Sequence, residues 1–190
     1  MRMAFLGSLT NLYELNMIRT AIILLTMMSF LSCKPTQNLS TVPMVEIEKY
    51  AGLWYEIARL PNSFEKGLEC VTATYTLKNN GKIEVLNQGY SIEEKEKLSR
   101  AKGRAWVPDT DFPGRLRVSF FWPFAGNYYI ISLDEEYNYA LVGDPSRKYL
   151  WVLARSKILD NTIYSKLLDV AKINGFDIDN LILVNQKCPN

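Results

Sequence analysis

Side chains that could carry out chemistry are few in this chain of 190 residues, and histidine is absent from it. Without an imidazole there is no histidine general base, no Ser-His-Asp triad and no histidine-based zinc or iron site. The groups left for catalysis or binding are carboxylates, tyrosines and cysteines. Four of them bear on function by their positions: Glu56, Cys33, Cys70 and Cys188. From this inventory we expect a protein that is not an enzyme and that holds no metal or other cofactor.

Length and charge further limit the domain organisation and the partners that this protein can have. A chain of this length is most simply one domain and can bury a sizeable core. Its charges are balanced, with 22 Lys and Arg against 20 Asp and Glu. A nucleic-acid-binding protein would carry a basic surface, so we expect no nucleic-acid partner.

Cys33 closes a stretch with the form of an export signal. The charged segment 17–20 precedes an apolar run over 21–31, which is too short for a comfortable transmembrane helix. We therefore predict a signal peptide over residues 1–33. Residues 1–16 add nothing that such a signal needs, so Met17 is the hypothetical true start.

The end of this signal resembles the lipobox of bacterial lipoproteins, which is cleaved before a cysteine that is then acylated. Ser32-Cys33 fits that pattern, whereas Phe30 stands where Leu is usual and Leu31 where a small residue is usual. The resemblance implies acyl chains such as palmitate on Cys33, enough for stable anchoring. The alternative is an ordinary secretory signal with an incidental cysteine.

Residues 34–42 are polar and contain one proline, which predicts a flexible tether. By the same resemblance, Lys34 directly after the cysteine favours the outer membrane. The expected location is therefore the periplasmic face of the outer membrane, with the protein held by its lipid anchor.

Beyond Cys70 the chain reads as a series of short strands separated by turns. Residues 71–77 alternate strictly, with Val71, Ala73 and Tyr75 on one face and threonines on the other. No helical pattern interrupts the series, so the connections favour antiparallel pairing. Counting the stretch that begins at Gly52, eight strands are expected, over about 52–60, 71–77, 82–90, 98–107, 115–121, 127–133, 137–142 and 149–155.

The pattern then changes to a helical one over residues 160–175, with one apolar face, a capping Asp160 and a terminating Gly175. Eight antiparallel strands can close into a barrel that holds side chains or one small ligand. We therefore predict an all-β fold, an eight-stranded antiparallel up-and-down β-barrel with a C-terminal α-helix packed outside.

Several motifs resemble the lipocalin family of small ligand-holding barrels. Gly52-x-Trp54 begins the first strand, residues 134–142 carry an acidic-Tyr turn, and Arg155 closes the eighth strand. Segments 62–67, 81–88 and 137–142 resemble the branch that contains apolipoprotein D and the bacterial outer-membrane lipocalins. The resemblance covers about residues 43–190, which we take as the lipocalin domain.

The resemblance implies roles for the motif residues and cysteines. Arg155 would pack over Trp54 at the closed end of the barrel, where Gly52 begins the first strand, in a cation–π contact of roughly 0.5–2 kcal/mol. Cys70 and Cys188 would form a disulfide between the second strand and the C-terminal tail. The alternative is a free Cys70 thiol acting as a nucleophile, as in one lipocalin enzyme, although no histidine is present to activate it.

Alternation along the strands predicts which residues face the interior. Trp54 sets the inward parity of the first strand, and the sixth strand allows either Tyr129 with Ile131 or Tyr128 with Ile130, of which we assign the former. The expected ligand-binding residues are Glu56, Ala58, Val71, Ala73, Tyr75, Val118, Phe120, Tyr129 and Trp151. The alternative is a barrel filled by its own side chains. Glu56 is the exception in an apolar lining, and we hypothesise that it helps to hold a ligand's polar head.

The turn between the fifth and sixth strands is too apolar for a loop in water. Strand counting places it at the open end, with Phe121, Trp122 and Phe124 at its tip. Exposed apolar patches mark partner or membrane contacts. We therefore expect a membrane contact beside the mouth, or alternatively a homodimer interface.

These observations favour binding and transport or storage of small hydrophobic ligands, such as fatty acids or lysophospholipids. Two other functions stay open. One is a lipid-modifying enzyme that works within the barrel, with Glu56 or a tyrosine as acid or base. The other is a structural envelope lipoprotein whose barrel serves only protein contacts.

Overall fold

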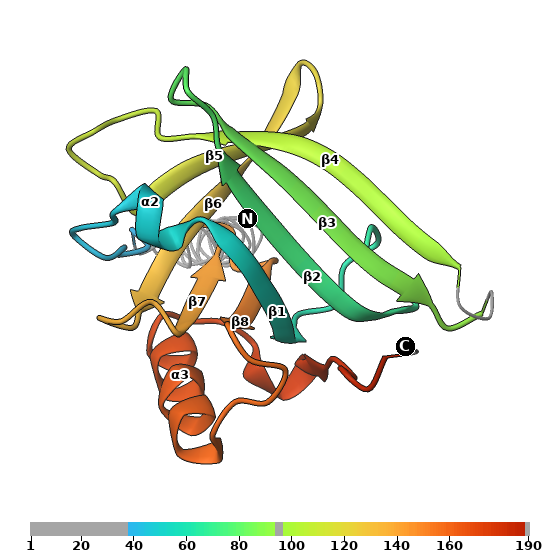
Figure 1. Cartoon of the computed structure of the whole chain (residues 1–190). Coiled ribbons are helices and arrows are strands. Elements are labelled where there is room, and N and C mark those ends of the chain that lie inside the picture. The colour runs from blue at the N-terminus through green and yellow to red at the C-terminus, as the bar shows by residue number, and fades with distance from the viewer. Residues whose placement is uncertain (1–37, 94–96, 189–190) are drawn as a thin grey trace, which may run out of the picture. The chain divides into compact units, whose positions relative to one another are not determined.

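Eight antiparallel strands follow one another around a closed barrel in the computed structural model, which describes residues 38–93 and 97–188 (Figure 1). Each strand pairs with the next, and β1 pairs with both β2 and β8, which closes the ring. This confirms the predicted fold. The strands are β1 (Gly52–Arg59), β2 (Leu68–Leu77), β3 (Ile83–Ser91), β4 (Leu98–Trp106), β5 (Arg115–Phe121), β6 (Phe124–Leu133), β7 (Tyr139–Gly143) and β8 (Leu150–Ala154).

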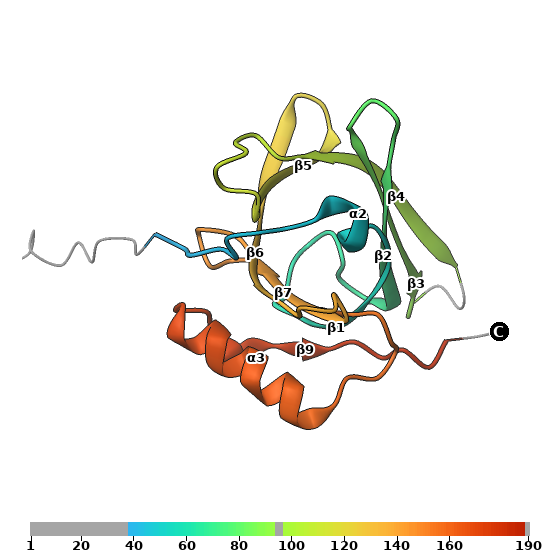
Figure 2. The ribbon, with the colours of Figure 1, turned by 60° about the vertical axis from the view of Figure 1, so that its left-hand side comes forward.

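Helix α3 (Asn161–Ile173) covers one side of the barrel from outside, as its single apolar face predicts (Figure 2). The Asp160 carboxylate caps it by accepting from the backbone N–H groups of Thr162 and Ile163. Leu167 and Ala171 on its inner face join an outer core with residues of β1, β7 and β8. The barrel wall thus separates two apolar cores, one inside the barrel and one beneath α3.

The closed end is sealed by the short helix α2 (Ile47–Tyr50), which lies across the end of the barrel in Figure 2. Trp54 is fully buried behind it, and the Arg155 guanidinium lies 3.9 Å from the centroid of the Trp54 ring. Arg155 Nη2 also donates to the carbonyls of Lys49, Tyr50 and Ala51 at the end of α2. One side chain therefore joins the helix, the first strand and the eighth strand.

Gly52 is required by this arrangement on two grounds. Its φ of +98° lies in the left-handed region that favours glycine. A Cβ added there would also come within 3.3 Å of Arg155 Nη1. A side chain at this position would therefore strain the backbone and crowd the guanidinium.

The C-terminal tail closes a gap between β1 and β2. The two strands pair only from Gly52 to Tyr55, and beyond that point the Gln186 side-chain amide donates to the carbonyls of Glu56 and Val71. After the 3-10 turn η1 (Ile178–Asn180), strand β9 (Ile182–Leu183) pairs with Ala58 and Arg59 of β1, on the side of β1 opposite β8. The Cys70–Cys188 disulfide holds the tail in place, which confirms the predicted bridge.

Part of the predicted tether is packed rather than free. Leu39 is fully buried in the outer core, and the Val42 N–H donates to the Ile130 carbonyl. The prediction of a flexible tether is therefore wrong for residues 38–42, because two apolar residues in a polar run, Leu39 and Val42, pack against the barrel. The signal peptide, Cys33 and Lys34 lie outside the described residues. Within residues 38–93 and 97–188, no helix has the length and apolar character needed to cross a bilayer.

Candidate functional site

On strands β5 and β8 the inner wall of the barrel is apolar and grows more accessible toward the open end. On β5, Leu116 is buried near the closed end, whereas Val118 and Phe120 further along are partly exposed. On β8, Leu153 is buried and Trp151 is partly exposed. Because these strands line the same interior, the gradient marks a region beside the mouth where inward apolar surface is not filled by neighbours.

The second strand does not share this gradient, because only the middle one of its predicted inward residues Val71, Ala73 and Tyr75 is accessible. Tyr75 is buried and Ala73 is partly exposed, and both pack in the inner core. Val71 is buried opposite Gly89, where an added Cβ would lie 3.0 Å from Val71 Cγ2. Val71 therefore fills its part of the wall closely, and of the three residues Ala73 alone is accessible.

Three charged side chains form a buried cluster on the inner wall. Glu56 and Arg59 of β1 and Glu65 of the loop after it are each at most 5% exposed. Arg59 Nη1 donates to Glu56 Oε1 at 2.6 Å, and Arg59 Nε lies 4.0 Å from Glu65 Oε2. One guanidinium thus serves two carboxyl groups, which leaves an excess of acid in a place shielded from water.

This excess of acid changes the pKa of Glu56. Burial raises the pKa of the Glu56 carboxyl to about 8, and the neighbouring Glu65 carboxyl adds to the rise by repulsion. Arg59 opposes the shift without cancelling it. At neutral pH the protonated form of Glu56 is therefore favoured, which relieves the repulsion between the two carboxyl groups.

The same cluster shapes the loop between β1 and β2. Arg59 Nη2 donates to the carbonyls of Glu65 and Leu68, and Glu65 Oε2 accepts from Asn62 Nδ2 and Trp151 Nε1. Trp151 stacks on Tyr149, whose ring centroid is 6.0 Å away, and the exposed Phe64 packs against Tyr149. The charged cluster therefore positions a set of aromatic side chains at the mouth.

The floor of the barrel carries a network of phenols. The Tyr50 and Tyr128 hydroxyls lie 2.7 Å apart, and the Tyr75 hydroxyl donates to that of Tyr128 at 2.8 Å. Burial raises the pKa of all three phenols, so they stay protonated. Their mutual hydrogen bonds let polar groups sit deep in an apolar core.

Two predicted inward residues face the other way. Ala58 lies in the outer core beneath α3, because a β-bulge between Glu56 and Ala58 reverses the parity of β1. Tyr129 also packs against the outer core, and Tyr128 takes the inner place. The predictions for Ala58 and Tyr129 are therefore wrong. The structure places Ala73, Tyr75, Val118, Phe120 and Trp151 at the inner core and buries Glu56, and contact of these residues with a ligand stays a prediction.

The apolar turn between β5 and β6 stands out from the surface. Phe121, Trp122 and Phe124 are each at least 77% exposed. The hairpin beneath them is held by Ser119 Oγ, which donates to the Phe124 carbonyl at 2.6 Å, and by an Arg117 side chain that bonds across to β6. Strand counting places this turn at the open end, but Figures 1 and 2 show it leaning outward beside the turn between β2 and β3.

Sequence reasoning missed Arg59, Glu65 and the inward place of Tyr128. The signal for Arg59 was its charge within an apolar strand, which is costly unless the charge is paired. Glu65 lies in a loop, where a carboxylate ordinarily faces water, so its residue type carried no signal. For Tyr128 no signal was available, because its neighbour Tyr129 is of the same type.

Comparison with known proteins places this geometry in context. The model of the family described as a lipocalin-like domain matches residues 45–186. Outer membrane lipoprotein Blc of Vibrio cholerae is 44% identical over 152 residues, which cover 80% of this chain and 88% of that protein. Apolipoprotein D of Mus musculus is 37% identical over 155 residues, which cover 76% and 79%.

The solved structures agree on the fold. Insecticyanin from the tobacco hornworm Manduca sexta superposes with a TM-score of 0.63 at 23% identity, over 78% of this chain and 84% of that one. At that identity the likeness concerns the barrel architecture alone.

Proposed function

The chain belongs to the lipocalin family, and from this premise we propose that its barrel binds and carries a single-chain amphiphile at the bacterial outer membrane. The ligand classes are fatty acids and lysophospholipids. The observation that carries the proposal is the gradient on β5 and β8, whose inward side chains stay apolar and become accessible toward the mouth. An acyl chain needs such a wall, because its binding rests on removing apolar surface from water.

The acyl chain would lie among Ala73, Val118 and Phe120. Its polar head would lie toward the mouth, near Trp151 and the cluster of Glu56, Arg59 and Glu65. The three side chains of this cluster already bond to one another, to the loop after β1 and to Trp151. We therefore infer that the cluster fixes the shape of the mouth, in addition to contacting the polar head. A protonated Glu56 also lowers the cost of placing an anionic head nearby.

Membrane attachment would come from two features. Acyl chains on Cys33 would anchor the chain, consistent with the outer membrane lipoproteins that are its relatives. The tip formed by Phe121, Trp122 and Phe124 would enter the bilayer, because its exposed aromatic surface is costly in water. The alternative role of the tip is contact with a second copy of the chain.

Mass spectrometry of the protein after gentle purification tests the ligand proposal. The expected result is a copurified fatty acid or lysophospholipid at one molecule per chain. Turnover of the bound lipid on incubation would favour a lipid-modifying enzyme instead. A barrel that carries no lipid and takes none up would contradict the proposal and favour a structural envelope lipoprotein.

A further inference from the structure

We propose that a groove on the outer wall, beside the exposed aromatic tip, binds the phosphate of anionic phospholipid headgroups. The inference rests on the proposed membrane contact of that tip and names the lipid class at the contact. It concerns the outside of the barrel, and its charged residues are distinct from those of the inner wall, although Phe120 lines both the groove and the wall.

The groove lies between two hairpins that come from opposite ends of their strands but project side by side over β4. In Figures 1 and 2 the turn between β2 and β3 lies beside the turn between β5 and β6. The groove between them has a volume of about 570 Å³, with Lys102 and Arg104 of β4 at its floor. Glu84 lines one side, and Ser119 and Trp122 line the other.

The shape of the groove follows from Gly103. A Cβ at this position would lie 2.8 Å from Phe120 Cδ1 and 2.8 Å from the Ser119 carbonyl oxygen. The missing side chain lets the β5–β6 hairpin approach β4 closely. As a result the cations of β4 lie at the foot of the aromatic tip.

The charge of the groove favours an anion. Arg100, Lys102 and Arg104 alternate along β4 on its outward face, and all three are exposed. Glu84, the acidic side chain in the groove, is engaged by Lys78 at 3.4 Å. Among the ion pairs formed by the described residues, none includes Lys102 or Arg104, so both cations are available to a ligand.

Arg104 joins the charged floor to the apolar tip. Its guanidinium lies 4.9 Å from the centroid of the Trp122 ring. When the indole enters the acyl boundary of a bilayer, this guanidinium lies at the depth of the headgroups. An arginine there can bind phosphate oxygens with two N–H groups, and Lys102 adds a second positive charge.

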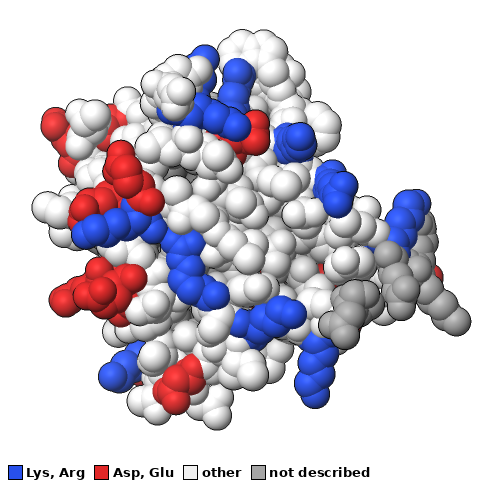
Figure 3. Space-filling model, viewed as in Figure 1, with Lys and Arg blue, Asp and Glu red and all other residues white. Residues whose placement is uncertain are grey.

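The distribution of charge over the visible face agrees with this orientation. In Figure 3, Lys and Arg lie along the upper edge and over β4 as well as on the left and lower parts of the face, whereas most Asp and Glu lie on the left and one acidic group lies near the upper edge. A molecule that approaches an anionic membrane by its upper edge therefore keeps most of the acidic side chains of this face away from the surface. A solvated charged strand alone would not explain why the cations adjoin the exposed aromatic tip.

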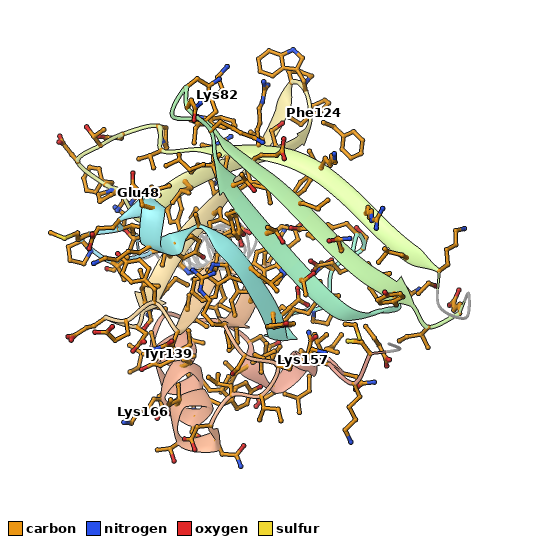
Figure 4. All side chains as sticks on the ribbon, viewed as in Figure 1. Glu48, Lys82, Phe124, Tyr139, Lys157 and Lys166 are labelled. Atoms are coloured by element: carbon orange, nitrogen blue, oxygen red, sulfur yellow. A yellow bond between two sulfur atoms is a disulfide. The ribbon has the colours of Figure 1, made fainter. Side chains whose placement is uncertain are left out.

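Vesicle binding tests the proposal on the chain from residue 33 onward with Cys33→Ser, since both apolar cores lie within residues 38–188. The vesicles are phosphatidylcholine alone or mixed with phosphatidylglycerol. We expect tighter binding to the mixed vesicles, and loss of most of that gain, about tenfold in affinity, in a Lys102→Gln/Arg104→Gln variant. The matched control is Lys157→Gln/Lys166→Gln, which removes the same charge on the side of α3, away from Lys82 and Phe124 (Figure 4).

Comparing variants distinguishes the contribution of the groove to membrane binding from that of the tip. A Trp122→Ser/Phe124→Ser variant should bind both kinds of vesicle more weakly. If the groove variant and the control variant bind the mixed vesicles equally well, the groove proposal is overturned while the tip keeps its role. If the groove variant loses as much affinity for neutral vesicles as for mixed vesicles, the cations act through packing of the tip. The proposal that the groove binds headgroup phosphate is then also overturned. If the unsubstituted chain binds neither vesicle, the membrane contact itself fails.

Discussion

Glu56 lies in surroundings that disfavour its own charge. Its carboxyl is buried, faces Glu65 and shares the single guanidinium of Arg59. Such clusters can be replaced by apolar groups without loss of stability, but breaking one by removing a single partner leaves a buried charge unpaired. Arg59 is therefore the member whose loss should be most damaging, because two carboxyl groups and two backbone carbonyls depend on it.

The pH dependence of stability follows from the raised pKa of Glu56. The folded state holds its proton up to about pH 8, whereas a carboxyl in the unfolded chain loses it near its ordinary value of 4.5. Between these values the unfolded state binds fewer protons, so the free energy of unfolding falls as pH rises, by at most about 1.4 kcal/mol per pH unit from this group. Urea denaturation at several pH values between about 5 and about 8 should show this fall, and Glu56→Gln should flatten it. Equal slopes in the two proteins would contradict the assignment.

Arg155 supports the closed end through more bonds than its cation–π contact alone. Replacing it by Met keeps an apolar cover on Trp54 but removes the donors to the carbonyls of Leu53, Lys49, Tyr50 and Ala51. We expect Arg155→Met to lower the free energy of unfolding by about 2–4 kcal/mol, measured by chemical denaturation. Arg100→Met, at an exposed arginine, is the control and should change stability by less than about 0.5 kcal/mol. A similar small effect at both positions would refute the role given to Arg155.

At the scale of single elements, strand alternation predicted most of the inner wall. It placed Trp54, Tyr75 and Phe120 inside because regular strands turn successive side chains to opposite faces. It failed on β1, where the bulge after Glu56 turns Ala58 outward and Arg59 inward. A bulge is set by pairing with a neighbouring strand, so the residue types of one strand do not reveal it.

The C-terminal tail acts as a ninth element of the wall. Where β1 and β2 separate, Gln186 Nε2 donates to the Glu56 carbonyl at 2.7 Å and to the Val71 carbonyl at 2.9 Å. Gln186→Leu would leave both carbonyls without this donor, and we expect a loss of about 2–4 kcal/mol in the free energy of unfolding. Lys187→Leu, at the exposed neighbour, should have little effect. Equal stability of the two variants would show that the tail is held by the disulfide alone.

For the whole molecule, sequence motifs predicted the fold better than they predicted the site. The barrel, the outer helix and the Cys70–Cys188 bridge follow from periodicity and from the family resemblance. The charged cluster does not, because Glu56, Arg59 and Glu65 meet only once the bulge and the loop have formed. The outer groove could not be predicted either, since it depends on two hairpins, distant in sequence, that stand side by side over β4.

The central claim is that an amphiphile occupies the barrel interior, and calorimetric titration with a lysophospholipid below its micellar concentration tests it directly. Ala73→Phe places a ring on the accessible inner wall, whereas Thr76→Phe places the same ring on the exposed outer face of the same strand. We predict one ligand per chain for the unsubstituted protein and for Thr76→Phe, and at least tenfold weaker binding for Ala73→Phe, roughly the 1.4 kcal/mol of one decade. Unchanged binding by a folded Ala73→Phe protein would contradict the claim.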